Sequence, residues 1–295
     1  MPLGVNLLKP EIRRGTPRGS SAFVDAAILF FAPPVEPATG YPRANMPHRN
    51  RTFFCATALM LCGCASPPSV QQYGAMREVL REGRTQPRIA LQDVTCQPGA
   101  IAVGALAGLG GEITIVNGKT WVARSNGGGV EVTGPTTSLD DQATLLTTSH
   151  VASWIDVPLP NGGEGRRLED MVAEVALKHG IDATKPFPFI IDGRFIELDI
   201  HVIAGSCPIA NPNGEPPWRY AATAPVAGLL VGFHALNQNG VMTHHGSNVH
   251  VHAIIGDQDD IVTGHVDHVI VEPGAVLRLP SVAAGFTTDP GLADP

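Results

Sequence analysis

The spacing of apolar residues along the chain predicts two helices. Residues 71–83 place Met76, Val79 and Leu80 on one side of a short helix that ends at a glycine. Residues 166–180 carry four apolar residues at helical spacing and also end in a glycine, which predicts an amphipathic helix. The four apolar positions are Leu168, Met171, Val172 and Val175.

Other apolar segments have the spacing of strands. Asn117-Gly118 separates "EITIV" from "KTWVA" and predicts a two-residue hairpin, because both central residues must tolerate positive φ. Two more strands are expected in residues 187–205 and another in residues 225–236. The segment 207–218, rich in Pro, Asn and Gly, predicts a surface loop or a boundary between two lobes, which we place near residues 205–225.

The composition agrees with a strand-rich globular protein. The 295 residues are 43% hydrophobic and include 33 Gly and 26 Pro, which suits one large unit or two small ones. No repeat with a period of about 20 to 50 residues is present. From Cys64 onward, 13 Lys and Arg oppose 24 Asp and Glu, a formal charge of about −11. Such an acidic chain argues against nucleic acid as a partner.

The N-terminal part has the features of a bacterial export signal. Residues 47–63 combine a short basic start, an apolar core too short to span a bilayer, and small residues before Cys64. The sequence "LCGC" (61–64) resembles the lipobox of bacterial lipoproteins, in which cleavage before the cysteine leaves its thiol to carry lipid. We therefore expect an exported periplasmic or cell-envelope lipoprotein, attached to the membrane only through Cys64. The alternative is an ordinary secretory signal.

These features divide the chain into three parts. Residues 1–45 are loop-like and rich in Pro, Gly and Arg, so we expect them to be a misassigned or disordered extension before a true start at Met46. Residues 46–63 are then the signal, and residues 64–295 form the mature domain. In an oxidising compartment Cys96 and Cys207 can pair, or they are two unrelated buried thiols.

Histidines are concentrated near the C-terminal end, where six of the eleven lie between His244 and His268. In "NVHVHAII", His250 and His252 are two residues apart and so share one face of a strand. The segment "GDQDD" predicts a turn, and "TGHVDHVIVE" predicts the returning strand. A hairpin that places His252 opposite His265 puts the third imidazole on the same face and His268 on the other.

Three neutral imidazoles suit Zn²⁺ and other borderline divalent metals, and three protein ligands leave coordination positions open for a reacting molecule. The alternative is a surface strand that has gathered histidines by chance. HxH followed by a later His also occurs in cupins and in the α-type carbonic anhydrases. The carbonic anhydrases differ, because Trp-Gly follows their pair and the third ligand is far more distant, whereas Ala253-Ile254 follows it here.

Two stretches together resemble the bacterial α-acetolactate decarboxylases. "GALAGLGGEITIVNGKTW" is similar to the family's glycine-rich N-terminal signature, and "HVHAIIGDQDDIVTGHVDH" is similar to its metal signature of HxH, a short acidic loop and Gly-His-Val. "FPFIIDGRFIELDIHV" and "LLVGFHALNQNGV" resemble the strands between them. The similarity runs from about Met76 to Pro280, and the order and spacing of the blocks are more specific than any one motif.

The resemblance implies a β-rich α+β fold, with a mixed or antiparallel sheet lobe, a smaller β-barrel-like lobe and the metal site between them. It also implies a homodimer. The metal, Zn²⁺ or another divalent transition metal, would be held by His250, His252 and His265, and Glu112 would be an active-site carboxylate. Without the resemblance, Glu112 is a polar residue at a strand start, a position that is more often solvated than functional.

This chain departs from the family pattern at two places. The family's arginine on the strand after Gly-x-Phe aligns with His201, and a second carboxylate near the family's C-terminus has no counterpart. His201 is either a proton donor, since a reference pKa of about 6.5 lets it carry or release a proton near neutrality, or a structural histidine. Arg194, His244 and His245 are weaker candidates for the missing roles, and Asp267 for a hydrogen bond to a metal-ligating residue.

The activity that the resemblance implies is decarboxylation of 2-acetolactate to acetoin and CO₂ through an enediolate chelated by the metal. Glu112 or His201 would then protonate the carbon, and no organic cofactor would be needed. Two alternatives stay open. One is an exported lipoprotein of the same fold that binds a metal or small ligand without catalysis. The other is a decarboxylase of a different 2-hydroxy-3-oxo acid.

Overall fold

The computed structural model describes residues 68–282, apart from 127, 138–139, 164, 207–210 and 258–259. The expected signal, Cys64 and Cys207 lie outside the described residues, so the predictions about them stay predictions. Cys96 is exposed, which corrects the expectation of a buried thiol. Within the described part, no helix is long and apolar enough to cross a membrane.

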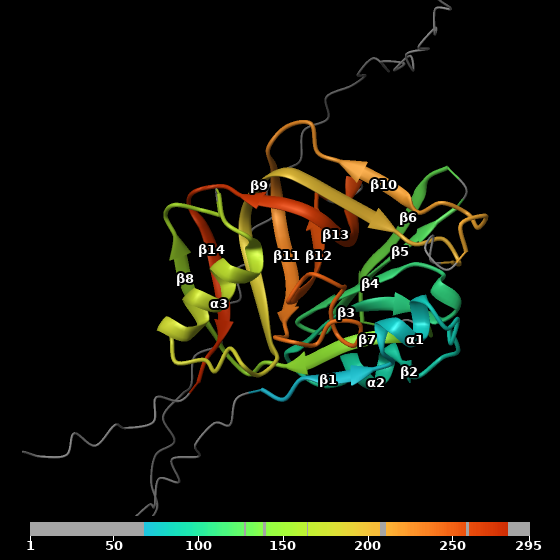
Figure 1. Ribbon diagram of the computed structural model, residues 1–295, viewed down its shortest axis with the longest axis horizontal. Coiled ribbons are helices and arrows are strands. Elements are labelled where there is room, and N and C mark those ends of the chain that lie inside the picture. Colours follow the sequence, from blue (N-terminus) through green and yellow to red (C-terminus); the bar gives the residue numbers. More distant parts are fainter. Residues whose placement is uncertain are drawn as a thin grey trace, which may run out of the picture. The chain divides into compact units, whose positions relative to one another are not determined.

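Antiparallel pairing of the described residues builds two seven-stranded sheets (Figure 1). The first has the order β1-β7-β3-β4-β5-β6, and β2 pairs with β7. Its strands are β1 (Gln71–Tyr73), β2 (Ile89–Ala90), β3 (Ala100–Leu106), β4 (Glu112–Val116), β5 (Lys119–Ser125), β6 (Val130–Thr136) and β7 (Gln142–His150).

The second sheet has the order β11-β12-β13-β9-β14-β8, and β10 pairs with β9. Because β11 pairs with both β12 and β9, the strands β9, β11, β12 and β13 close into a barrel. The strands of this sheet are β8 (Trp154–Leu159), β9 (Phe187–Val202), β10 (Trp218–Ala221), β11 (Val226–His234), β12 (Val249–Ile255), β13 (Val262–Val271) and β14 (Ala275–Pro280). The β-rich fold with a barrel-like part is confirmed.

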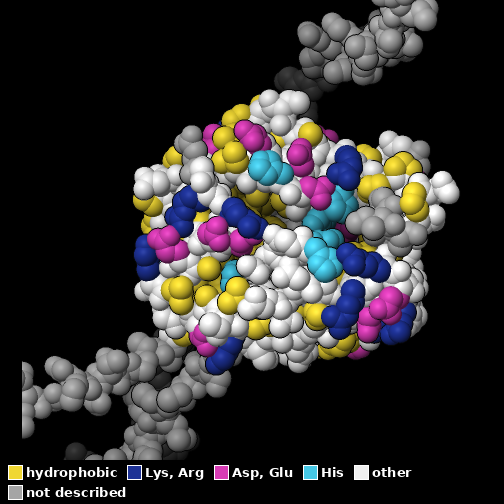
Figure 2. All heavy atoms as spheres, viewed as in Figure 1, with side chains coloured by type: hydrophobic (Ala, Val, Ile, Leu, Met, Phe, Trp, Pro, Cys, Tyr) yellow, Lys and Arg dark blue, Asp and Glu magenta, His cyan; other side chains and the backbone are white. Residues whose placement is uncertain are grey.

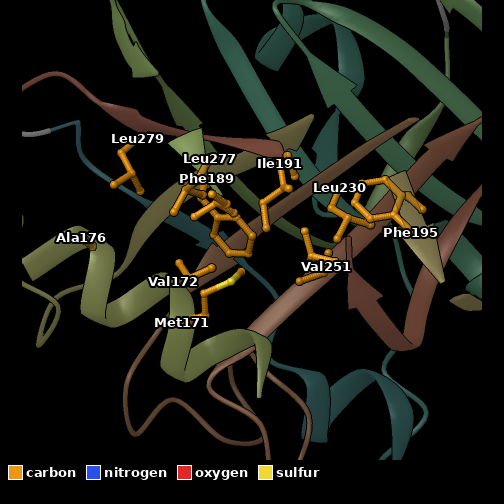
Figure 3. Packing of buried hydrophobic residues seen from close by; sticks show 14 of the residues in the cluster. Met171, Val172, Ala176, Phe189, Ile191, Phe195, Leu230, Val251, Leu277 and Leu279 are labelled. Atoms are coloured by element: carbon orange, nitrogen blue, oxygen red, sulfur yellow. The ribbon is translucent and has the colours of Figure 1, made fainter. Parts of the chain in front are cut away.

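Helices cover parts of each sheet. The short helices α1 (Met76–Leu80) and α2 (Leu91–Thr95) lie beside the first sheet, and a 3-10 turn, η1 (Ala107–Leu109), joins β3 to β4. The longer helix α3 (Leu168–Lys178) confirms the helix predicted in residues 166–180. Figure 3 shows its buried face, from which Met171, Val172 and Ala176 point toward the apolar side chains of the second sheet.

The segment predicted as one helix over residues 71–83 forms a strand followed by a shorter helix. Gln71–Tyr73 pairs with β7, and Gly74, at φ 73°, turns the chain before α1 begins. A strand forms here because pairing with β7 gives hydrogen-bond partners to the backbone N–H and C=O groups. The first turn of a helix would leave these groups to water. Gly83 has φ 68° just after the helix, as expected for a helix stop.

Two strands were predicted in residues 187–205, and the structure has one 16-residue strand, β9. The turn-like pair Asp192-Gly193 stays extended because β11 pairs with β9 continuously across it. A further irregularity follows at Glu197, whose φ is 51° and where the register with β13 shifts. These features let one strand bend through the barrel. The predicted hairpin at Asn117-Gly118 is confirmed, with φ values of 55° and 74°.

The change from one sheet to the other lies between β7 and β8, at residues 151–153. The lobe boundary was expected near residues 205–225, but that region connects β9 to β10, which pair within the second sheet. The two sheets meet in a shared apolar cluster, in which Ile101 and Val103 of β3 pack near Val231 and Phe233 of β11. This contact brings the start of β4 next to the barrel strands that carry the histidines.

Candidate metal centre

The barrel hairpin formed by β12 and β13 brings three histidines together. His252 is paired directly with His265, as the sequence predicted, and His250 lies two residues before His252 on the same strand. One ring nitrogen from each of the three lies within 4.8 Å of the others, and all three side chains are buried. His268 is exposed instead and lies 3.3 Å from a carboxylate oxygen of Glu197.

A glycine allows this hairpin to lie close to β9. A Cβ at Gly264 would come 2.6 Å from the carbonyl oxygen of His201, so only glycine fits there without a shift of backbone. This close approach places His265 directly opposite His201 in the strand register. Their ring centroids are 4.9 Å apart.

Burial keeps the three imidazoles neutral. It lowers the pKa of His252 to about 3 and lowers the pKa values of His250 and His265 well below 6.5. A neutral imidazole has a free lone pair, which is the form that binds a metal ion. In these surroundings the three rings are available as ligands at neutral pH.

Thr114, on β4, orients the ring of His252. Its hydroxyl lies 3.1 Å from Nδ1 of His252 and 3.0 Å from the hydroxyl of Thr263. The opposite nitrogen, Nε2, is buried and has no hydrogen-bond partner among the described residues, and the same is true of Nδ1 of His250. Unpartnered buried nitrogens are costly unless they bind something. This donor set fits a divalent transition metal.

Glu112, the first residue of β4, lies against the histidine group. Its Oε2 is 3.6 Å from Nε2 of His252, and its Oε1 accepts a hydrogen bond from the backbone N–H of Ile203 at 3.4 Å. Burial raises its pKa to about 7. Gly111 allows this placement, because a Cβ there would come 2.1 Å from the carbonyl oxygen of Ala123.

His201, at the end of β9, belongs to a chain of charged groups. Its Nδ1 and Oδ1 of Asp267 are 2.8 Å apart, and Oδ2 of Asp267 accepts a hydrogen bond from Nη1 of Arg219, also at 2.8 Å. Burial alone would lower the pKa of His201. The hydrogen bond to Asp267 and the negative charges of Glu112 and Asp267 outweigh burial and raise this pKa.

The remaining sequence candidates lie in different places. His244 packs its ring 4.7 Å from that of His265, and burial lowers its pKa to about 4. His245 is exposed, and Arg194 is an exposed partner of Glu272 that does not line the cavity described below. Asp267 contacts His201 rather than one of the three clustered histidines.

A cavity of about 270 Å³ opens beside the three-histidine group, and His250 and His265 line it. Its polar wall contains Glu112, His201 and Arg219, and its apolar wall includes Met76 and Leu145. This volume suits a small molecule rather than a polymer. A wider groove of about 770 Å³, beside the N-terminal end of α3, shares His244, His265 and Asp267 with the cavity but lacks Glu112. Figure 2 shows histidine, acidic and basic side chains gathered around a hollow near the centre of this face.

Two residues of the site were missed by the sequence analysis. Arg219 lies in β10, a four-residue strand that follows the Pro-rich loop and was not predicted. Thr114 looks like an ordinary strand residue within "EITIV". Its place opposite Trp121 in the hairpin gave no signal, since the contact with His252 depends on how the two sheets pack.

The fold and the site define a β-barrel protein with a buried three-histidine group suited to a metal ion. Its fold is that of the α-acetolactate decarboxylases. The Bacillus subtilis strain 168 enzyme has a TM-score of 0.53 and 17% identity, over 72% of this chain and 85% of that one. Acetolactate decarboxylase from B. subtilis subspecies spizizenii gives 0.54 and 16%, over 72% and 85%.

A Staphylococcus aureus protein of unknown function, described as similar to α-acetolactate decarboxylase, has a TM-score of 0.52 and 14% identity, over 71% of this chain and 84% of that one. No protein-family model and no curated protein sequence matches the chain. At these identities the likeness establishes the fold, and the activity has to be argued from the site.

Proposed function

We propose that this protein is a metal-dependent decarboxylase that converts 2-acetolactate to acetoin and CO₂. The observation that carries the proposal is the set of three buried, neutral imidazoles, which lies against Glu112 at the wall of a small cavity. The fold shared with acetolactate decarboxylases supports the choice of reaction. The apolar wall of the cavity supports a substrate with methyl groups.

His250, His252 and His265 would hold the ion, Zn²⁺ or another divalent transition metal. When bound, the ion supplies Lewis acidity and a template for the ketone and hydroxyl oxygens of the substrate. The contact between Thr114 and His252 fixes the ring orientation, and such supporting contacts strengthen metal binding.

The reaction requires one proton, which a residue of the protein must supply. The bond between the substrate carbon and its carboxylate breaks, CO₂ leaves, and the electron pair moves toward the ketone to give an enediolate. Protonation of that carbon then yields acetoin, so one proton is consumed for each acetolactate anion. Glu112, whose pKa is raised to about 7 by burial, holds such a proton near neutral pH.

His201 is the second candidate for this proton transfer. Its Nδ1 faces Asp267, so its Nε2 is the nitrogen left to carry a proton for the cavity. Its raised pKa favours the protonated form near neutrality. Solvent at the open side of the cavity can restore the proton after each turnover.

The direct test is an acetoin assay. Zinc-loaded protein is incubated with racemic 2-acetolactate, and acetoin and CO₂ are followed against the spontaneous reaction. We expect acetoin to form well above the spontaneous rate, with at most half of the racemate consumed if a single enantiomer fits the cavity. Metal-stripped protein should match the spontaneous rate, and zinc should restore activity. Absence of acetoin from fully loaded protein would reject the proposal.

One observation favours a second class of function. His201 stands where the family that the chain resembles has an arginine, and this change favours a different contact with the substrate. A binding protein without catalysis, or a decarboxylase of another 2-hydroxy-3-oxo acid, fits this change. Full metal occupancy without CO₂ release from any such acid would favour the binding protein. Release from a different acid, with none from acetolactate, would favour the second enzyme.

We further propose that the protein is exported, carries lipid on Cys64 and forms a homodimer. The basic start, apolar core and "LCGC" of residues 47–64 support the first two points. Mass spectrometry of the protein from its native cells should find an N-terminal lipidated Cys64. Recovery of an intact N-terminus at Met1 would contradict export. Light scattering of residues 64–295 should give twice the mass of one chain.

A further inference from the structure

The cavity in front of the three-histidine group has one permanently charged cation in its described wall, Arg219. The other lining groups that ionise are Glu112, Asp267 and histidines. A small anionic substrate brings a carboxylate that must be matched by positive charge or hydrogen-bond donors when it leaves water. Arg219 is therefore the residue of this wall best suited to that task.

Contacts on both faces of β10 hold Arg219 in place. In the register of β9 and β10, Arg219 is paired directly with His201, so the two side chains share one face. Its neighbours Trp218 and Tyr220 point to the other face and stack with their ring centroids 6.4 Å apart. Tyr220 packs against the apolar core of the second sheet, which anchors the short strand.

Asp267 holds Arg219 and His201 side by side. One carboxylate oxygen contacts Nη1 of Arg219 and the other contacts Nδ1 of His201, each at 2.8 Å. A guanidinium has five N–H donors arranged to grip a carboxylate through two of them. Of the guanidinium nitrogens of Arg219, only Nη1 donates a hydrogen bond to another described residue. The other donors remain for a second carboxylate at the cavity.

We propose that Arg219 binds the carboxylate of the substrate at the mouth of this cavity. The inference rests on the proposed function, since it takes the substrate to be a small 2-hydroxy-3-oxo acid. The carboxylate lies at the Arg219 side of the cavity. The methyl groups lie toward the apolar wall formed by Met76, Leu80 and Leu145.

The chemistry of decarboxylation predicts which kinetic constant depends on Arg219. The carboxylate loses its charge as it becomes CO₂, so its bond to a guanidinium weakens on the way to the transition state. An interaction that is stronger in the ground state lowers KM without raising kcat. Loss of Arg219 should therefore raise KM for acetolactate by about 10-fold or more, with kcat unchanged or slightly higher.

A binding experiment separates this role from catalysis. The probe is 2,3-dihydroxy-2-methylbutanoate, in which a hydroxyl replaces the ketone, so that it cannot lose CO₂ by the same route. Its binding to zinc-loaded protein is measured by calorimetry for the wild type, Arg219→Gln and Arg219→Lys. Acetoin serves as the neutral comparison. Arg194→Gln is the matched control, because Arg194 is similarly exposed, pairs with one carboxylate and lies outside the cavity.

We expect Arg219→Gln to weaken binding of the acid by about 10-fold or more, Arg219→Lys to recover part of the loss, and Arg194→Gln to match the wild type. Acetoin binding should be the same in all four proteins. If the wild type and Arg219→Gln bind the acid equally, the role of Arg219 is wrong and the proposed function stands. If the zinc-loaded wild type binds no acid and forms no acetoin, the proposed function fails and this inference fails with it.

Discussion

The imidazole of His252 has its two nitrogens in different surroundings. Nδ1 contacts the hydroxyl of Thr114, while Nε2 faces Glu112 and has no hydrogen-bond partner among the described residues. A hydrogen bond at one ring nitrogen fixes the tautomer and leaves the lone pair of the other nitrogen for a metal. In the proposed metal site, Nδ1 of His252 would donate its proton to the hydroxyl of Thr114 and leave Nε2 for the ion, so Thr114 would orient a ligand from the other sheet.

This contact predicts the effect of Thr114→Val. The substitution keeps the shape but removes the hydroxyl, so zinc affinity should fall by about 10- to 100-fold. Thr148→Val is the matched control, because Thr148 is also buried in the first sheet but its hydroxyl bonds the carbonyl of Ile101. Competition with a chelator measures both. Equal affinity of Thr114→Val and the wild type would show that this contact does not prepare the ligand.

Glu112 is the residue on which the proposed proton transfer depends most. Glu112→Gln keeps the size of the side chain but cannot donate an acidic proton, so kcat should fall by about 10²- to 10⁴-fold. Zinc content, measured by metal analysis, should stay near that of the wild type, because the three histidines remain. If kcat is unchanged, His201 is left as the donor. If zinc is lost, Glu112 acts in metal binding.

Two secondary-structure elements support the barrel: α3 packs against its sheet, and β9 pairs with four other strands of that sheet. Helix α3 covers one side of the second sheet with a stripe of apolar residues, and β9 contributes hydrogen bonds to β10, β11, β13 and β14. The hairpin of β12 and β13 depends on this frame for the position of its histidines. Loss of packing at α3 should therefore destabilise the protein without touching the site directly.

Met171 and Leu177 give a matched test within α3. Met171 is 1% exposed and packs into the core, whereas Leu177 is 61% exposed. Met171→Ala should lower the free energy of unfolding by about 2–5 kcal/mol, since it leaves a cavity in a packed core. Leu177→Ala should change it by less than about 0.5 kcal/mol. Urea unfolding measures both, and equal effects would contradict the packing of α3.

For the whole molecule, the buried histidines connect folding to pH when the metal is removed. Burial lowers the pKa values of His244, His250, His252 and His265 below 6.5, so the folded chain resists protonation where the unfolded chain accepts it. The unfolded state then binds more protons, and stability falls as pH drops below 6.5. Glu112 and His201 act in the opposite direction, because burial raises the pKa of Glu112 to about 7 and the contact with Asp267 raises the pKa of His201. Two groups with raised pKa values against these four imidazoles leave a net loss on acidification.

The expected result is a lower urea midpoint for chelator-treated protein at about pH 5.5 than at about pH 7.5. His244→Gln should show a shallower change, because it removes one of the groups with a lowered pKa. A midpoint that stays constant or rises on acidification would contradict the burial of these neutral rings.

The sequence predicted local features better than packing. Period-two spacing and the turn "GDQDD" were enough to place His250, His252 and His265 on one face, and Asn117-Gly118 located its hairpin. The contact of Glu112 with His252 joins residues 140 positions apart and depends on the meeting of the two sheets, so only the resemblance indicated it. β10 and Arg219 gave no periodic signal because the strand has four residues.

We propose that His250, His252 and His265 hold a catalytic divalent ion, and a comparison of two variants with the wild type tests this proposal. Zinc content and acetoin formation are measured side by side for the wild type, His252→Ala and His268→Ala of residues 64–295. We expect one zinc per chain and acetoin from the wild type and from His268→Ala, whose removed ring is exposed and paired with Glu197. His252→Ala should have neither. Full zinc and activity in His252→Ala would contradict the claim.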